Sequence, residues 1–320
     1  RNFMSMFLAA STQHFRGKGV VWRSIVISRP ARLRREHHSL AIEQEQTAFV
    51  PFEDIAVIML NHREITLTHA VLSACGEHGI SLFATGMTHH PCGVFLSFLP
   101  HTRATRWLRL QLSLPRPLAK QIWASIVRKK IANQATCLKL SNREGADRLE
   151  SYVQRVRSGD TSNLEGQAAA FYFAKLFGKN FRRPHKHFIN AVLDYGYAIL
   201  RGAIARALVA HGLFPSLGLF HASEQNAFNL ADDIIEPFRP LVDLFATNLA
   251  IPIDDELSPE TKVALINLLN VDVIMPRGKM SVLSAIEHVV ESLARIYDDG
   301  DKVCLELPSL DGLELHKLEY

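Results

Sequence analysis

A histidine and several acids lie close together in the segment LFHASEQNAFNLADDIIEPFRP, residues 219–240. His221 follows an apolar run, and a helix predicted to begin around Asn226 carries Asp232, Asp233 and Glu236. Residues three or four apart share a helix face, so Glu236 can point the same way as either aspartate. A neutral imidazole beside carboxylates is a donor set for a divalent cation. The alternative is a solvated acidic helix face and a histidine that is packed or hydrogen-bonded.

A further acid, Glu165, lies in the first turn of a second predicted helix, NLEGQAAAFYFAKLFG, which opens at Asn163. The helix dipole alone favours an acid in this turn. The position of Glu165 is therefore compatible with a structural role as well as a catalytic one. His211, near the C-terminus of the long apolar helix that follows, is explained by the same dipole and is not counted as a ligand.

The charges of the chain are distributed unevenly, although its formal net charge is only +4. No acid occurs between Glu77 and Glu144, an interval with many basic residues, among them Lys130, Lys139 and Arg143. A second interval without acids, between Glu165 and Asp194, contains Lys175, Lys179, Arg182, Arg183 and Lys186. A polyanion responds to local potential more than to net charge. Either interval alone could be a solvated helix face, but two of them favour nucleic acid as a partner.

Composition and missing motifs exclude several classes of protein. The chain is 48% apolar and 21% charged, as in soluble globular proteins, and it contains no apolar run that could span a bilayer. Its four cysteines form no CxxC pair, which indicates reduced thiols in a cytoplasmic protein. Neither a Gly-rich dinucleotide or phosphate loop nor a GxSxG elbow is present.

The periodicity of apolar residues predicts an α+β protein with a small β-rich domain followed by a larger all-α domain. Runs such as IAVIMLN are typical of buried strands, whereas from His101 apolar residues recur at helical spacing. The predicted divisions are an N-terminal extension or cloning remnant (1–20), the β-rich domain (21–100), the helical domain (101–305) and a tail (306–320). Within the last part of the helical domain, Met275 to Lys279 is predicted to be a loop.

Four sequence blocks, LEGQAAAFYF, NAVLDYGYAIL, GLFH and ADDIIEPFRP, occur in this order, and together they resemble the CRISPR-associated integrase family (Cas-one). The resemblance extends from about Val21 to Asp299 and implies the same two-domain fold. It implies that Glu165, His221 and Glu236 are catalytic ligands of Mg²⁺ or Mn²⁺, with Asp233 in support. Glutamate at the third ligand position resembles the set associated with type II systems.

By the same resemblance, Arg182 and Arg183 fall near the DNA-contacting surface, and Lys139 and Arg143 are further candidates for DNA contact. The family inserts short foreign DNA fragments into a CRISPR array by transesterification, as homodimers assembled with the small second Cas protein. These partners, and double-stranded DNA, are therefore expected here, without a membrane. Two alternatives remain: a stand-alone structure-specific DNA endonuclease, and a non-catalytic DNA-binding scaffold whose carboxylates pair with arginines.

Overall fold

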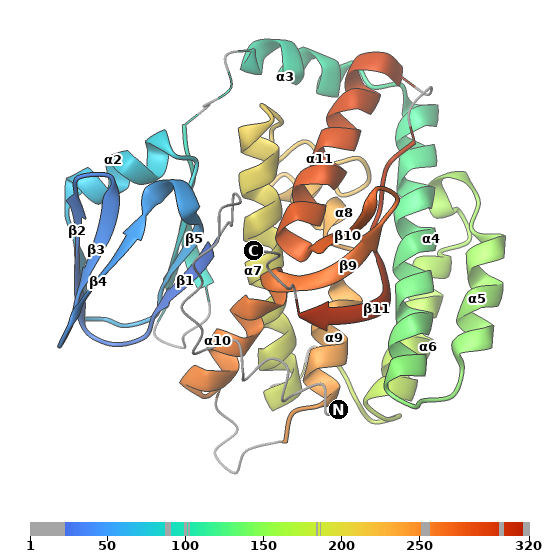
Figure 1. The fold of residues 1–320 in the computed structure, drawn as a ribbon. Helices are drawn as coiled ribbons and strands as arrows, with labels where there is room; N and C mark the ends of the chain where they lie inside the picture. Colours follow the sequence, from blue (N-terminus) through green and yellow to red (C-terminus); the bar gives the residue numbers. More distant parts are fainter. Residues whose placement is uncertain are drawn as a thin grey trace.

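The structure is a computed structural model that describes residues 23–86, 91–98, 101, 103–183, 185, 187–250, 257–300 and 304–315. The predicted N-terminal extension lies outside the described residues. An N-terminal domain of strands and one helix packs beside a larger helical domain (Figure 1). The N-terminal elements are β1 Arg23–Ile27, β2 Ala31–Glu36, β3 Ser39–Glu43, β4 Thr47–Pro51, a short 3₁₀ helix Phe52–Asp54, β5 Ile55–Leu60, β6 Ile65–Leu67, α2 His69–Glu77, β7 Ser81–Thr85 and β8 Pro91–Phe95.

These strands form two sheets, in the orders β1-β5-β7-β8 and β4-β3-β2-β6. In the first sheet β1, β5 and β7 are parallel and β8 is antiparallel to β7. The continuous apolar sequence of β5 predicts a strand that is buried on both faces. The structure confirms this: Ile55 and Ile58 belong to the core of the N-terminal domain, whereas Ala56 and Met59 belong to the core shared with the helices.

The helical domain is arranged around α7, whose apolar sequence predicts a buried central helix. The elements are α3 Ala104–Leu112, α4 Arg116–Leu140, α5 Ala146–Arg155, a 3₁₀ turn Ser158–Asp160, α6 Leu164–Leu176, α7 Phe188–Ala210, α8 Asn229–Ile234, α9 Arg239–Thr247, α10 Pro259–Asn267, a 3₁₀ turn Leu268–Asn270 and α11 Val282–Asp299. Helices α8, α9, α10 and α11 all pack on α7, which is buried along most of its length. The prediction for this helix is confirmed.

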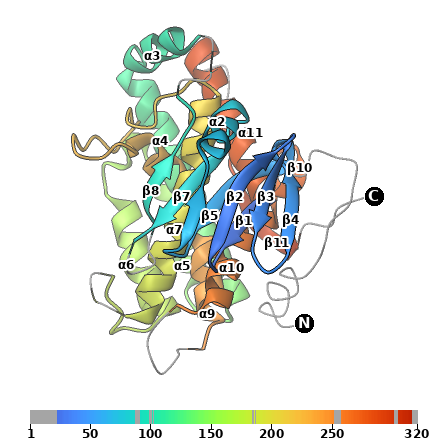
Figure 2. The same cartoon turned by 90° about the vertical axis from the view of Figure 1, so that its left-hand side faces the viewer.

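The two domains meet where α7 passes the first sheet, a contact visible in Figures 1 and 2. Gly202 of α7 lies directly against the ring of Phe83 on β7. A Cβ atom at Gly202 would lie 1.6 Å from Cζ of Phe83, so only glycine allows this approach. Interiors are close-packed, and the domains therefore share a continuous core at this point.

The prediction of an all-α second domain is wrong in one respect. The predicted loop, residues 275–279, contains the turn of a hairpin formed by β9 Val271–Met275 and β10 Gly278–Ser281, and β11 Ser309–Leu315 pairs with the other edge of β9. Gly278 adopts a φ of +123°, which permits the tight turn. Residues 309–315 are thus part of the domain, and the prediction of a tail from residue 306 is wrong for them. Such short strands give little periodic signal, and the strand partner of β11 is distant in sequence.

The four cysteines are unpaired, as their spacing predicts, with Cys75 and Cys137 buried and Cys92 and Cys304 exposed. Burial raises the pKa of Cys75 to about 11, so this thiol is inert at neutral pH. Within the described ranges, no helix has the length and apolar character needed to cross a membrane.

Candidate active site

Glu165 occupies the first turn of α6, as predicted, and its backbone is held by two capping side chains. The carboxylate of Asp160 accepts hydrogen bonds from the amides of Leu164 (3.0 Å) and Glu165 (2.8 Å). The side chain of Asn163 accepts one from the amide of Gly166 (3.2 Å). Such caps stabilise the start of a helix. The Glu165 side chain therefore extends from a fixed point.

His221 is positioned by Asp233, which is fully buried on α8. The Asp233 carboxylate accepts backbone hydrogen bonds from Leu219 (2.5 Å), Phe220 (3.1 Å) and His221 (3.2 Å), and it also contacts Nδ1 of the His221 ring at 2.7 Å. This hydrogen bond to Asp233 raises the pKa of His221, although burial opposes the shift. With Nδ1 engaged in this way, Nε2 is the nitrogen available to a ligand.

Glu236 lies in a turn, which corrects the prediction of one helix from Asn226 through Glu236. Helix α8 begins at Asn229 and ends at Ile234, and α9 begins only at Arg239. Pro237 lacks an amide proton and interrupts the helix. The Pro237 carbonyl instead accepts a hydrogen bond (2.7 Å) from the buried side chain of Asn133 on α4. This bond anchors the turn, and with it Glu236, to a different helix.

Lys130 of α4 lies between the two glutamates. Its ammonium forms ion pairs with Oε1 of Glu165 and Oε2 of Glu236, while Nε of Arg239 contacts Oε1 of Glu236 at 2.9 Å. The Lys130 and Glu236 side chains are only 8% and 7% exposed. Lys130 was counted in the first basic interval, but its burial removes it from any basic surface.

The charges of this cluster stabilise one another. Burial alone would raise the pKa of Glu236, but Arg239 and Lys130 bring it down to about 2. Burial alone would lower the pKa of Lys130, but Glu236 and Glu165 raise it above its usual value. Buried charges persist when they are paired and hydrogen-bonded. Glu236 and Lys130 are therefore both ionised at neutral pH.

The donor chemistry of the site suits a hard divalent cation. The carboxylates of Glu165 and Glu236 converge on one cationic group, which contacts Oε1 of Glu165 and Oε2 of Glu236. His221 is near enough for the Glu236 charge to contribute to its raised pKa. In the described part of the chain, no three His, Cys, Asp or Glu side chains are already arranged to hold a metal ion. The Lys130 ammonium lies between the carboxylates instead.

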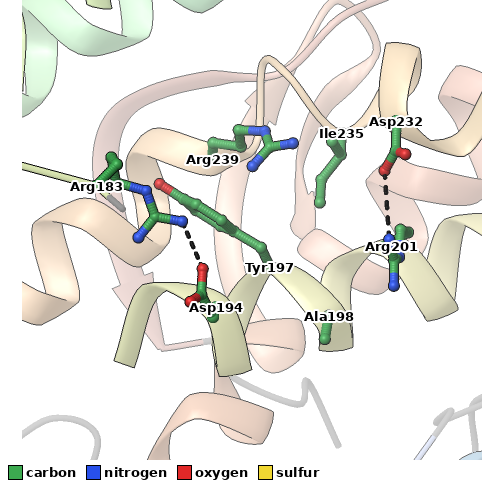
Figure 3. Close-up of a pocket in the computed structure, with 8 residues that line it drawn as sticks. All are labelled: Arg183, Asp194, Tyr197, Ala198, Arg201, Asp232, Ile235 and Arg239. Atoms are coloured by element: carbon green, nitrogen blue, oxygen red, sulfur yellow. Dashed lines mark hydrogen bonds and ion pairs between the residues drawn. The ribbon is translucent and has the colours of Figure 1, made fainter. Parts of the chain in front are cut away.

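A polar pocket of about 400 Å³ adjoins this site (Figure 3). It is lined by Arg183, Asp194, Tyr197, Ala198, Arg201, Asp232, Ile235 and Arg239. Arg183 pairs with Asp194 at 2.5 Å, and Arg201 lies 3.9 Å from Asp232. Arg239 connects the two regions, because it binds Glu236 and its guanidinium lies 4.5 Å from the centre of the Tyr197 ring.

The residues predicted to contact DNA lie in different local settings. Arg183 lines the pocket, whereas the exposed Arg182 donates hydrogen bonds to the carbonyls of Lys179 and Phe181. Lys139 forms an exposed ion pair with Glu150. By helical rise, Lys139 lies about 13 Å along α4 from Lys130. Arg143 is exposed just beyond the end of α4, and Lys186 lies outside the described residues.

Sequence reasoning missed Lys130, Asn133, Arg239 and Asp243. Lys130 and Asn133 lie one helical turn apart on the buried face of α4, so polar residues within an apolar stripe were the available signal. Asp243 is buried on α9 and accepts hydrogen bonds from the hydroxyls of Tyr197 and Tyr172. Burial raises the pKa of Asp243 to about 6, against the effect of these hydrogen bonds.

Comparisons with known proteins find relatives that match most of the chain. The family profile described as CRISPR associated protein Cas1 matches residues 25–251. The chain is 42% identical over 304 residues to the CRISPR-associated endonuclease Cas1 of Neisseria meningitidis serogroup C (strain 8013), covering 94% of this chain and 100% of that relative.

Two solved structures share the fold. One is a casposase bound to integration product, with a TM-score of 0.72 and 17% identity over 94% of this chain and 96% of that one. The other is a Cas6-RT-Cas1--Cas2 complex, with a TM-score of 0.69 and 19% identity over 92% of this chain and 37% of that longer chain. At these identities the likeness shows the fold alone.

Proposed function

The chain belongs to the Cas1 family of CRISPR-associated proteins, and on this premise we propose that it is a metal-dependent DNA integrase of CRISPR adaptation. One observation carries the proposal: Glu165 and Glu236, from separate elements, converge on a single cation position near His221. The Neisseria relative is named an endonuclease, and one structural neighbour is a casposase bound to integration product. Both names support chemistry on phosphodiester bonds.

The proposed reaction is a transesterification. A 3′-hydroxyl of the foreign fragment attacks a phosphodiester of the CRISPR repeat, a new P–O bond forms, and the bond to the departing 3′-oxygen breaks. The proton of the attacking hydroxyl is lost and the departing oxygen gains one, so the number of phosphodiesters is conserved. The protein needs no nucleophile of its own for this exchange. It has to orient the two strands and stabilise negative charge.

Glu165, Glu236 and Nε2 of His221 are the residues that would hold the ion. Bound Mg²⁺ or Mn²⁺ would polarise the phosphodiester and stabilise charge on the attacking and departing oxygens. Asp233 orients the His221 ring by its hydrogen bond to Nδ1. Arg239 holds the second oxygen of Glu236. These contacts keep the ligands in fixed relative positions.

The proposed partners are double-stranded DNA, a second copy of the chain and the small Cas2 protein, acting in the cytoplasm. A Cas1–Cas2 assembly among the structural neighbours supports Cas2. The arginine-lined pocket beside the site supports DNA, because guanidinium groups bind phosphate. Dimerisation is tested by light scattering of the purified chain, and the Cas2 complex by co-elution of the two proteins.

The catalytic proposal is tested with a labelled DNA fragment and a supercoiled plasmid that carries the array. Glu165→Gln, His221→Ala and Glu236→Gln are each expected to reduce strand transfer to background while the protein remains folded. Glu291→Gln, an acid that pairs with Arg277 on the surface, is the matched control and should retain activity.

Two other functions predict different outcomes of this assay. Plasmid cleavage without joining would support a stand-alone structure-specific endonuclease. The pairing of Glu236 with Lys130 and Arg239 is the observation that favours a non-catalytic DNA-binding scaffold. Binding of DNA without strand transfer or cleavage in any divalent cation would support that scaffold, and undiminished joining in all three variants would refute the assigned residues.

A further inference from the structure

We propose that Lys130 is an internal counter-ion that occupies the cation position between Glu165 and Glu236, and that a divalent metal binds there only by displacing its ammonium group. The inference rests on the proposed metal-dependent function and adds a residue that controls metal entry. The ion pairs of Lys130 with carboxylates from α6 and from the α8–α9 turn are its starting point.

The location of Lys130 distinguishes it from a surface lysine. Its side chain is 8% exposed and arises from the middle of α4, so the ammonium has little access to water. An isolated buried ammonium is strongly unfavourable, and Lys130 is stable there only because both carboxylates face it. The converse also holds, since Glu165 and Glu236 would repel each other without a cation between them.

Glu236 divides its two oxygens between two cations. Oε1 contacts Arg239 at 2.9 Å, and Oε2 faces Lys130 without an aligned hydrogen bond. A divalent ion that used Oε2 of Glu236 and Oε1 of Glu165 would require the two oxygens that Lys130 now contacts. Two cations a few ångströms apart in a buried site repel strongly. The ammonium and the metal therefore exclude each other because they would use the same oxygens, whereas Arg239 contacts the other oxygen of Glu236.

The surroundings permit this exchange without loss of the site. Asn133 anchors the turn that carries Glu236, and Asp160 anchors the start of α6 below Glu165. Neither contact involves Lys130, so the backbone that carries each carboxylate keeps its anchor when the ammonium leaves. A lysine carries its charge on a flexible four-carbon stem, which allows it to withdraw. Lys130 is thus a removable cation in a rigid frame.

The first test measures Mn²⁺ affinity by electron paramagnetic resonance of the free ion, with wild type, Lys130→Met and Lys129→Met. Lys130→Met removes the competing charge and should bind Mn²⁺ about tenfold tighter or more. Lys129→Met makes the same change in charge one residue away on α4 and should match wild type. Equal or weaker binding by Lys130→Met would overturn the displacement.

The second test needs no metal and measures urea unfolding in EDTA for Lys130→Met, Glu165→Gln and the double variant. If Lys130 is the counter-ion of Glu165, Lys130→Met unfolds at lower urea than wild type. The double variant then regains part of that loss, because one unpaired carboxylate is gone. A double variant no more stable than Lys130→Met would contradict the assignment.

The outcomes separate this inference from the proposed function. If wild type binds Mn²⁺ and Lys130→Met binds it no tighter, only the role of Lys130 fails. If neither protein binds Mn²⁺, metal dependence itself fails, and the displacement fails with it. Tighter binding by Lys130→Met together with recovery in the double variant supports both.

Discussion

The cluster around Lys130 and the pocket around Arg201 lie side by side but differ in how far their charged side chains are buried and paired. In the cluster, Lys130 and Glu236 are buried and held within ion-pair distance. In the pocket, the side chain of Arg201 is 42% exposed and lies 3.9 Å from Asp232 (Figure 3). Buried charges are positioned by the fold, whereas exposed charges remain available to a polyanion.

Neighbouring residues of α8 serve these different regions. Asp233 points to the loop of His221, whereas Asp232 accepts a hydrogen bond from Asn226 and lines the pocket. Successive residues of a helix project about 100° apart. One turn of α8 can therefore contribute a carboxylate to the cluster and another to the pocket. Arg239 contacts both regions, through Glu236 in the cluster and Tyr197 in the pocket.

The largest expected effect concerns Asp243, which supports the pocket wall through Tyr197. Its pKa is about 6 in the folded protein against a usual value of 3.8, so the native state binds a proton more tightly than the unfolded chain. The resulting stability is fully present below about pH 4 and is lost as pH rises through 6, by about 3 kcal/mol. Because an asparagine side chain does not titrate, the stability of Asp243→Asn relative to wild type should increase by that amount between pH 4 and pH 7.

Urea unfolding of wild type and Asp243→Asn across this pH range measures the difference. Parallel stability curves for the two proteins would show that Asp243 titrates as in the unfolded chain.

A second expected effect separates the two sides of α8. Asp233→Asn weakens the hold on the His221 ring and loop and should lower strand transfer or Mn²⁺ affinity by about 10- to 100-fold, as for residues that orient metal ligands. Asp232→Asn should act instead on DNA affinity, because Asp232 faces the pocket. Equal losses of Mn²⁺ affinity in the two variants would show that α8 acts as one unit.

The smallest expected effect tests the pocket. Arg201→Gln should reduce the slope of log K for duplex binding against log salt by about 1, the value for one lost phosphate contact. Lys139→Gln is the comparison, because Lys139 is already paired with Glu150 and should change the slope less. Binding titrations at several salt concentrations measure both slopes. A larger change of slope for Lys139→Gln than for Arg201→Gln would show that DNA binds near Lys139 and not at the pocket.

Strong periodic signals predicted much of the fold. The apolar run of β5 and the long apolar α7 were identified because burial on all sides leaves continuous hydrophobic sequence. The sheet of β9, β10 and β11 was missed because its strands are short and β11 follows only after α11. The position of Glu165 in a first helical turn was predicted correctly, but the helix expected to carry Glu236 ends before it.

The basic intervals show why local composition misleads about charge. Lys130 and Lys139 lie in a long stretch without acids, yet each is paired with glutamates from beyond that stretch. A count along the chain cannot register partners that folding brings from other helices. The sequence predicts that Lys130 belongs to a basic surface, whereas in the structure it lies between two glutamates.

By itself, the sequence determined the Cas1 family and the acids and histidine proposed as ligands, because these depend on residue types in a fixed order. Only the tertiary structure decided what surrounds them. It brought Lys130 between Glu165 and Glu236, set Asp233 behind His221, and turned Asp232 toward the pocket. The physical reason is that the energy of a charge depends on burial and on neighbours distant in sequence, which one-dimensional spacing does not contain.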